Sequence, residues 1–164
     1  MENTRGWFLR YNDMVGVYHG ESDRSAAILA SSVLESFLGD VMRDFLAPDD
    51  AVEALLSGYG PLATFSARIE FAYVLGLVTP DVRRDFNLIR KVRNHFAHHP
   101  AAVSFADAPI RDWCAALSMA QPMQKDDGTM HQEENPRHQF LFTIAMDMLR
   151  THRILETQSR RVIA

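Results

Sequence analysis

The sequence predicts an all-α protein that forms a bundle of about six to seven helices. Apolar residues recur at spacings of three and four in segment after segment, which is typical of amphipathic helices, whereas the alternation of a half-buried strand is weak throughout. The 164 residues fit a single domain spanning 1–164. Hydrophobic residues make up 47% and charged residues 23%, which indicates a globular chain with a sizeable core and not a disordered one.

The N-terminal part predicts two amphipathic helices. Apolar side chains recur at helical spacing through residues 3–18. Ser22 or Asp23 then caps a longer helix over 22–46, which Pro48 stops. The apolar stripe of this second helix is wide, so we expect it at the centre of the core. The stripe consists of Ala26, Leu29, Ala30, Val33, Leu34, Phe37, Leu38, Val41 and Phe45.

The middle of the chain predicts a short helix, a loop and a buried helix. Residues 49–56 suit a short helix, and the glycines and proline of 57–61 indicate a loop. Residues 64–76 are apolar on almost every side, which indicates a helix buried all round, and Gly76 ends it.

A further central helix, over 80–98, has clear signals at both ends. Thr79 is a capping residue and Pro80 stands at the first helical position, a combination favoured where helices begin. Pro100 ends the helix. Its core-facing residues are spaced by three and four: Val82, Phe86, Ile89, Val92 and Phe96.

The C-terminal third predicts two helices separated by a loop. Asp107-Ala108-Pro109 resembles a helix start and precedes a short apolar segment. Residues 121–135 are polar and are expected to form a mobile loop. A last helix begins at Pro136 and runs to about Leu155, and the polar, basic tail 156–164 is expected to fray.

Hydropathy, charge and cysteine content limit the classes of function. No apolar run approaches the roughly 18 residues of a membrane span and no signal peptide is recognisable, so we expect a cytoplasmic protein without membrane contact. The single cysteine, Cys114, excludes an intrachain disulfide framework and lies on an apolar face, where a buried, inert thiol is expected. The formal net charge of −4 argues against non-specific coating of DNA.

Three histidines near the end of the 80–98 helix raise the question of a metal site. The spacing of His95, His98 and His99 allows two ligands on one face, but no cysteine or acid cluster accompanies them. We therefore expect no metal and no cofactor.

The 80–98 helix also carries the most informative charge. Arg93 falls within its apolar stripe, where an unpaired charge would be very costly. The guanidinium therefore needs a carboxylate, backbone carbonyls, a cleft or a second subunit. The acids available on neighbouring helices are Asp23, Glu35, Asp40 and Glu70, and we predict that Asp23 is the partner.

A polar stripe runs beside the apolar one, because Arg90, Asn94 and His98 step by four residues. A purely structural interpretation is also open: Arg93 pairs with an acid, while Asn94 and the histidines cap the C-terminus of the helix, where positive groups are favoured.

Three segments resemble the mannitol operon repressor (MtlR-type) family. They are ESDR at 21–24, YGPLATFSARI at 59–69 followed by YVLGL at 73–77, and LIRKVRNHFAH at 88–98. The resemblance covers residues 20–100 and implies a compact helical domain that regulates transcription of a sugar-alcohol operon negatively. We expect structural or interface roles for charged residues of these segments, namely Asp23, Arg24, Arg68, Arg90 and Arg93.

The family resemblance implies no known DNA-binding surface, and the residues agree with that. A helix-turn-helix protein needs a basic recognition helix with a free face. Here the most basic helix needs its apolar face for the core, and its cations are spread around its circumference: Arg83, Arg84, Arg90, Lys91 and Arg93. We therefore predict a non-enzymatic repressor that acts through a protein partner, as a homodimer, without direct sequence-specific binding of DNA.

The spacing Arg93-Asn94-x-x-x-His98 also resembles the Arg-x4-His motif of HEPN domains, which are helical, often dimeric and in many cases metal-independent RNases. That resemblance implies His98 as general base or acid on the ribose 2′-hydroxyl, Arg93 as the group that stabilises the phosphorane, and Asn94 as the group that orients the phosphate. The alternative function is thus an endoribonuclease that cleaves RNA at a dimer cleft.

Overall fold

A computed structural model describes residues 18, 20–46, 49–99, 101–124 and 127–162. The predicted all-α fold is confirmed, because six α-helices account for most of these residues and the sheet that they contain is one short hairpin. The predicted helix over 3–18 lies almost entirely outside the described residues. The elements are α2 (Asp23–Phe45), α3 (Asp50–Leu56), α4 (Phe65–Val74), α5 (Pro80–His98), α6 (Ile110–Ala115), η1 (Ser118–Ala120), β1 (Met123–Gln124), β2 (Met130–His131) and α7 (Pro136–Val162).

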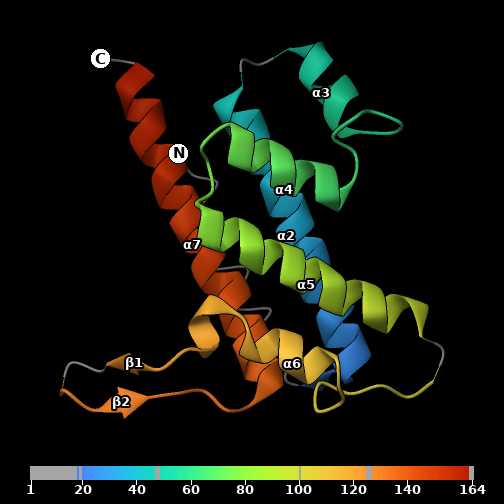
Figure 1. The fold of residues 1–164 in the computed structure, drawn as a ribbon. Helices are drawn as coiled ribbons and strands as arrows, with labels where there is room; N and C mark the ends of the chain where they lie inside the picture. The colour runs from blue at the N-terminus through green and yellow to red at the C-terminus, as the bar shows by residue number, and fades with distance from the viewer. Residues whose placement is uncertain (1–17, 19, 47–48, 100, 125–126, 163–164) are drawn as a thin grey trace.

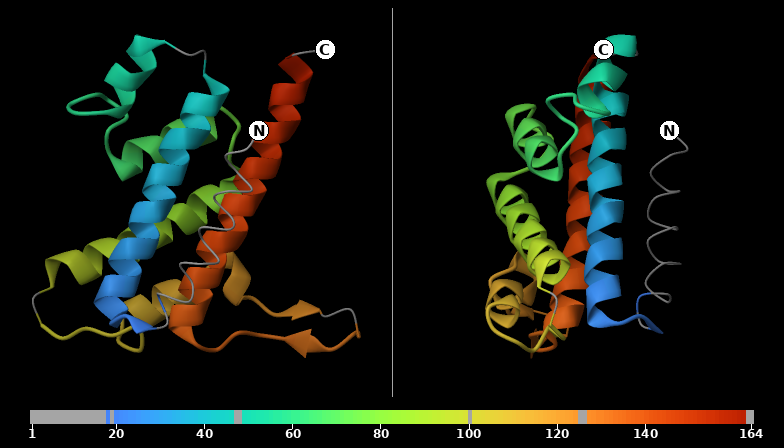
Figure 2. Two further views of the ribbon diagram at one scale, coloured as in Figure 1. Left: turned by 180° about the vertical axis from the view of Figure 1, so that it is seen from behind. Right: turned by 90° about the vertical axis from the view of Figure 1, so that its right-hand side faces the viewer.

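Three helices build the centre of the bundle. The long helices α2 and α7 run side by side in the same direction, and α5 crosses both of them (Figures 1 and 2). Helix α4 packs on α5 and α2, while α6 packs on α5 and α7. The hairpin β1–β2 projects from the end of the bundle where α7 begins (Figure 1).

Helix starts follow the predicted capping signals. The Ser22 hydroxyl accepts a hydrogen bond from the Ser25 amide at 3.2 Å, and α2 begins at the next residue. The Thr79 hydroxyl accepts one from the Val82 amide at 3.4 Å ahead of Pro80. These side chains satisfy amides that have no partner inside the helix, so the predicted starts of α2 and α5 are confirmed.

The core uses the apolar stripes of α2 and α5. All five predicted core residues of α5 are no more than 1% exposed, whereas Leu29 of α2 is 43% exposed. By length and composition α2 would also suit a membrane span, but 56% of its most apolar window is buried inside the protein. Packing in the core therefore accounts for the apolar composition of α2.

Helix α4 is not buried all round, contrary to the prediction. Tyr73 is 36% exposed and Val74 is 76% exposed. The neighbours α2 and α5 cover only one side of α4, which buries Phe65, Ile69 and Ala72. Gly76 ends the segment as predicted, at a φ of +70° that favours glycine.

The structure has a short hairpin within the predicted loop and a longer last helix than the sequence predicts. Within 121–135, β1 and β2 pair antiparallel, with Met123 opposite His131. Helix α7 runs on to Val162, beyond the predicted end near Leu155. One physical reason is a long-range contact, since the Gln158 side-chain amide donates to the Gly76 carbonyl at 3.0 Å.

Arg68 joins three parts of the fold through backbone carbonyls. Its guanidinium donates to the carbonyls of Leu62, Glu35 and Leu56 at 3.0, 2.8 and 2.9 Å. On α2 the neighbouring residue is Gly39, where an added Cβ would lie 3.2 Å from Arg68 Nη1. The small residue lets the guanidinium approach α2, and the half-buried cation joins carbonyls of the α2 interior, of the last residue of α3 and of the loop after it.

Replacing this arginine should cost far more stability than replacing an exposed one. We expect Arg68→Ala to lower the free energy of unfolding by about 3 kcal/mol, because it leaves carbonyls unpaired in a partly buried site. The matched control is Arg43→Ala, which removes an exposed ion pair with Glu53 and should cost less than about 1 kcal/mol. Urea denaturation followed by circular dichroism measures both, and equal losses would contradict the assigned role of Arg68.

Candidate protein interface

The first turn of α2 holds α7 and the 101–109 segment in place. Asp23 Oδ1 forms a salt bridge with Arg137 Nη1 at 2.8 Å, and Asp23 Oδ2 accepts a hydrogen bond from the Phe105 amide at 2.9 Å. The predicted pair of Asp23 with Arg93 is therefore wrong. The prediction fails because the first turn of α7 lies next to the first turn of α2, so that Arg137 binds the Asp23 carboxylate in place of Arg93.

Arg24 closes the C-terminal end of α5. Its guanidinium donates to the carbonyls of Phe96, His99 and Ala101 at 2.5, 2.5 and 3.0 Å. The last carbonyls of a helix have no partner within it, and a cation there also suits the helix dipole. Arg24, which stands on α2, thus caps carbonyls that the sequence assigned to Asn94 and the histidines of α5. The His99 amide and ring still contact the His95 carbonyl.

Two arginines in the second half of α5 are held by amide side chains. Arg93 is half-buried, and its Nη1 donates to Asn94 Oδ1 at 3.0 Å. Arg90 is also half-buried, and its Nη2 lies 3.4 Å from Asn87 Oδ1. Within the described part of the chain, neither guanidinium forms a salt bridge, and the buried Arg90 Nε has no hydrogen-bond partner. The last turns of α5 project past α2 (Figures 1 and 2).

The positive charge on the first half of α5, by contrast, is balanced by a carboxylate of α4. Arg83 forms a salt bridge with Glu70 and lies 4.5 Å from the ring centre of Tyr73. Asn87 donates to the same Glu70 carboxylate at 3.3 Å. The hydrogen bond from Arg83 lowers the pKa of Glu70, so this carboxylate stays ionised and offsets the positive charge beside it.

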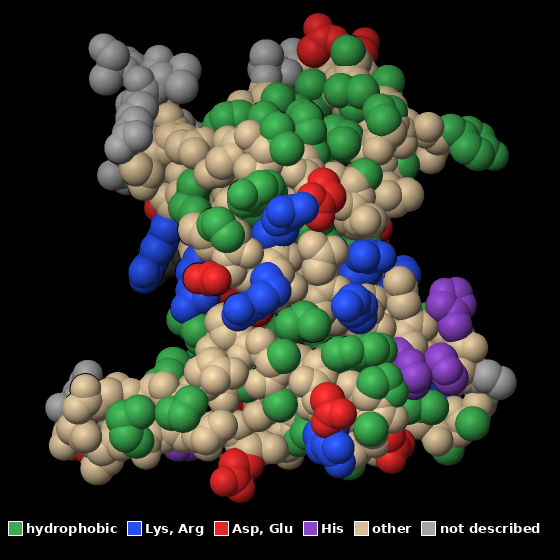
Figure 3. All heavy atoms as spheres, in the orientation of Figure 1, with side chains coloured by type: hydrophobic (Ala, Val, Ile, Leu, Met, Phe, Trp, Pro, Cys, Tyr) green, Lys and Arg blue, Asp and Glu red, His purple; other side chains and the backbone are tan. Residues whose placement is uncertain are grey.

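Five Lys and Arg residues stand on α7, and five more stand between Arg83 and Arg93 on α5. Figure 3 shows Lys and Arg side chains gathered in a band along this helix, with histidines at its end. We define the α5 cation face as Arg90, Arg93, Asn94 and Ala97, which share one side of the helix at spacings of three and four. Ala97 is exposed, and the other three are half-buried.

Two of the three histidines at the end of α5 form a stack. The rings of His95 and His99 lie 3.7 Å apart and parallel, with Trp113 edge-on to His95 at 5.7 Å. Burial, helped by the neighbouring His99, lowers the pKa of His95. His98 is exposed at the helix end. Among the described residues, no three His, Cys, Asp or Glu side chains converge as metal ligands.

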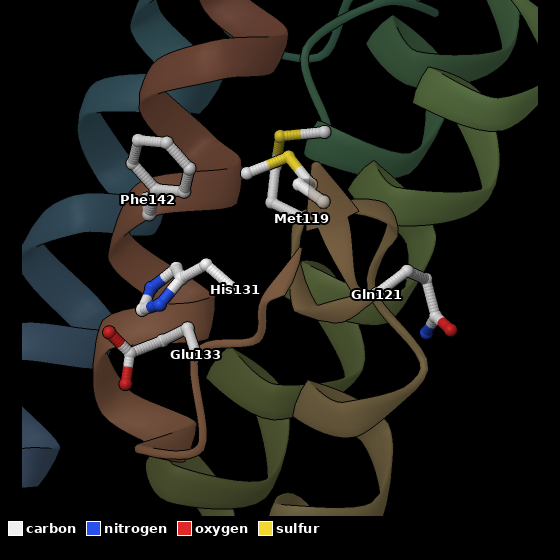
Figure 4. A pocket seen from close by; sticks show the side chains of 6 residues that line it. Met119, Gln121, His131, Glu133 and Phe142 are labelled. Carbon is white, nitrogen blue, oxygen red and sulfur yellow. The ribbon is translucent and has the colours of Figure 1, made fainter. Parts of the chain in front are cut away.

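A small cavity lies at the base of the hairpin. It has a volume of about 220 Å³ and opens between the hairpin, η1 and α7 (Figure 4). Its lining is Met119, Gln121, Met123, His131, Glu133 and Phe142.

On α6, burial raises the pKa of Cys114 to about 12, which agrees with the predicted inert thiol.

Two fully buried acids, which we did not predict, join α5 to α7. Asp85 and Asp147 are both 0% exposed. Asp85 accepts two hydrogen bonds from the Ser118 amide at 3.2 Å, and Arg84 Nη2 lies 3.6 Å from its Oδ1. Asp147 Oδ1 binds Arg150 at 3.1 Å, while its Oδ2 has no hydrogen-bond partner among the described residues. Burial and the nearby Asp85 raise the pKa of Asp147 to about 8, despite Arg150.

A family of known proteins matches most of the described chain. The family described as "Mannitol repressor" matches residues 23–159. The mannitol operon repressors of Escherichia coli K12 and Escherichia coli O6:H1 are each 29% identical to it over 115 residues. The match covers 67% of this chain and 58% of each relative, so the chain spans less than two thirds of their length.

One solved structure has a similar fold. It is the X-ray structure of the MtlR-HPr complex from Escherichia coli, which matches with a TM-score of 0.68 at 19% sequence identity. The match covers 89% of this chain and 98% of that chain, so the two share their helical architecture.

The buried acid pair should make stability fall as pH rises. Because the folded-state pKa of Asp147 lies far above its unfolded value of about 4, the folded protein keeps a proton that the unfolded chain loses. The free energy of unfolding should therefore decrease from about pH 4 to about pH 8. In Asp147→Asn that decrease should be largely absent, so the variant should be more stable than the wild type at pH 8 and similar at pH 4.

Thermal unfolding at both pH values measures this difference. The control is Asp112→Asn, which alters an exposed carboxylate beside Arg111 and should leave the pH dependence unchanged. If Asp147→Asn followed the wild-type pH dependence, the neutral state of Asp147 in the fold would be refuted.

Proposed function

The chain belongs to the mannitol repressor family, and from that membership we propose that it is a negative regulator of transcription that acts through a protein partner. The observation that carries the proposal is the family match over residues 23–159, which runs from the start of α2 to near the end of α7. The names of the two curated relatives, both mannitol operon repressors, support the same role.

The nature of the partner follows from the solved relative. That structure is a complex of MtlR with HPr, and this chain matches almost the whole length of the matched chain. We therefore propose a protein of the HPr type as a partner of this chain.

The expectations of a cytoplasmic location and of a homodimer remain part of the proposal. Sedimentation analysis of the purified protein measures the oligomeric state.

The packing of α5 supports a mechanism without a DNA-reading helix. A recognition helix must enter the major groove with one side free of the rest of the protein. Helix α5 carries five Lys and Arg residues, yet α4 covers one flank, α6 covers another and its apolar side is fully buried. Repression would then depend on contacts with another protein.

Binding assays should separate the two mechanisms. We expect the purified chain to bind HPr from the organism that encodes it, with saturable heat in calorimetry. We also expect the chain alone to leave operator DNA unshifted at physiological salt, with a scrambled fragment as control. A sequence-dependent shift by the chain alone would contradict the partner-mediated mechanism, and absence of HPr binding would remove the proposed partner.

The same proposal predicts no RNase activity. Wild type and His98→Ala should show equal background cleavage of RNA in EDTA, because Arg93 and His98 would be positions on a binding helix and not catalytic groups. Metal-independent cleavage that disappears in His98→Ala would instead establish the endoribonuclease alternative.

A further inference from the structure

We propose that the α5 cation face is a docking surface for an acidic surface of a protein partner. The inference rests on the proposed function, in which the chain acts through protein contacts, and it adds the place and the chemistry of one such contact. It does not assign HPr to this face.

The first argument is that no salt bridge with a described residue neutralises this face, where Arg90 has only a longer-range electrostatic interaction with Glu70. Among the described residues, six arginines form salt bridges with carboxylates, and Arg24 and Arg68 hold backbone carbonyls. Arg90 and Arg93 contact side-chain amides instead. An amide orients a guanidinium but leaves its full positive charge in place.

The second argument concerns the energetic cost of that arrangement. A half-buried guanidinium has lost part of its hydration, and without a carboxylate it does not recover the loss. A carboxylate from a partner would bind the remaining N–H donors in the fork geometry that arginine presents. The two side chains, one turn apart and already oriented by Asn87 and Asn94, are therefore prepared to receive such a group.

The third argument concerns shape. Ala97 lies on the same side of α5, one turn beyond Arg93, and is exposed. Its methyl group leaves room for the backbone of another element to approach α5 between the cations. Small contact residues flanked by charged ones allow close helix packing while the charges set its orientation.

Charge balance favours an acidic protein over a nucleic acid. The chain carries a net charge of −4, so its positive face is a local one, to which an acidic patch of a partner would be attracted. A nucleic-acid backbone is commonly bound through about six to ten phosphate contacts. Here the cations without a salt bridge in the described helix are Arg90, Lys91 and Arg93, and Glu70 borders them through Asn87.

The test uses a fluorescein-labelled peptide of 20 glutamates as the acidic probe, measured by fluorescence anisotropy at low and physiological salt. The paired substitution Arg90→Gln/Arg93→Gln should weaken binding at least tenfold. Ala97→Glu should do the same, because it places a negative charge on the exposed part of the face without changing the core. Arg111→Gln, on α6, is the matched control and should bind as the wild type does.

Three results would overturn the proposal. One is that the α5 variants and the Arg111→Gln control bind the peptide equally, since attraction would then be general. Another is that the wild type does not bind the peptide. The third is that a 20-nucleotide oligouridylate binds more tightly than the peptide and is lost with the same substitutions, which would make a nucleic acid the occupant. Titration of HPr against the same variants keeps the two proposals apart, because retained HPr binding leaves the proposed function intact whatever the peptide does.

Discussion

Two adjacent residues at the start of α2, Asp23 and Arg24, join the main helices of the bundle. Asp23 forms a salt bridge with Arg137 in the first turn of α7, and Arg24 binds carbonyls at the end of α5. Since the two side chains leave α2 in different directions, one helical turn fixes the ends of two other helices. The orientation of the α5 cation face relative to the core depends on this junction, because the second half of α5 projects past the helices that cover its first half.

Local signals allowed several helix boundaries to be predicted from sequence. Thr79-Pro80 and Pro100 define α5 closely, because capping and the geometry of proline act within a few residues. The exposed side of α4 and the full length of α7 could not be predicted in this way. The first depends on how many neighbours cover Val74, and the second on the contact of Gln158 with Gly76, which is 82 residues away along the chain.

The candidate site shows the same division between local and long-range information. A charge within an apolar stripe marked Arg93 as a residue that needs a partner, but the choice of that partner depended on how the helices pack. The same criterion, applied to the apolar stripes of α5 and α7, would have marked Asp85 and Asp147 as well. Arg137 carries no such signal, because it stands in the polar first turn of α7, and only the fold brings it to Asp23.

The account therefore depends on the end of α5 being held by α2, and amide hydrogen exchange tests this most directly. In Arg24→Gln, the amides of residues 96–99 should exchange at least tenfold faster than in the wild type, while those of 85–89 stay protected. Equal exchange at 96–99 in the two proteins would contradict the account, because the outer face of α5 would then be positioned without this junction.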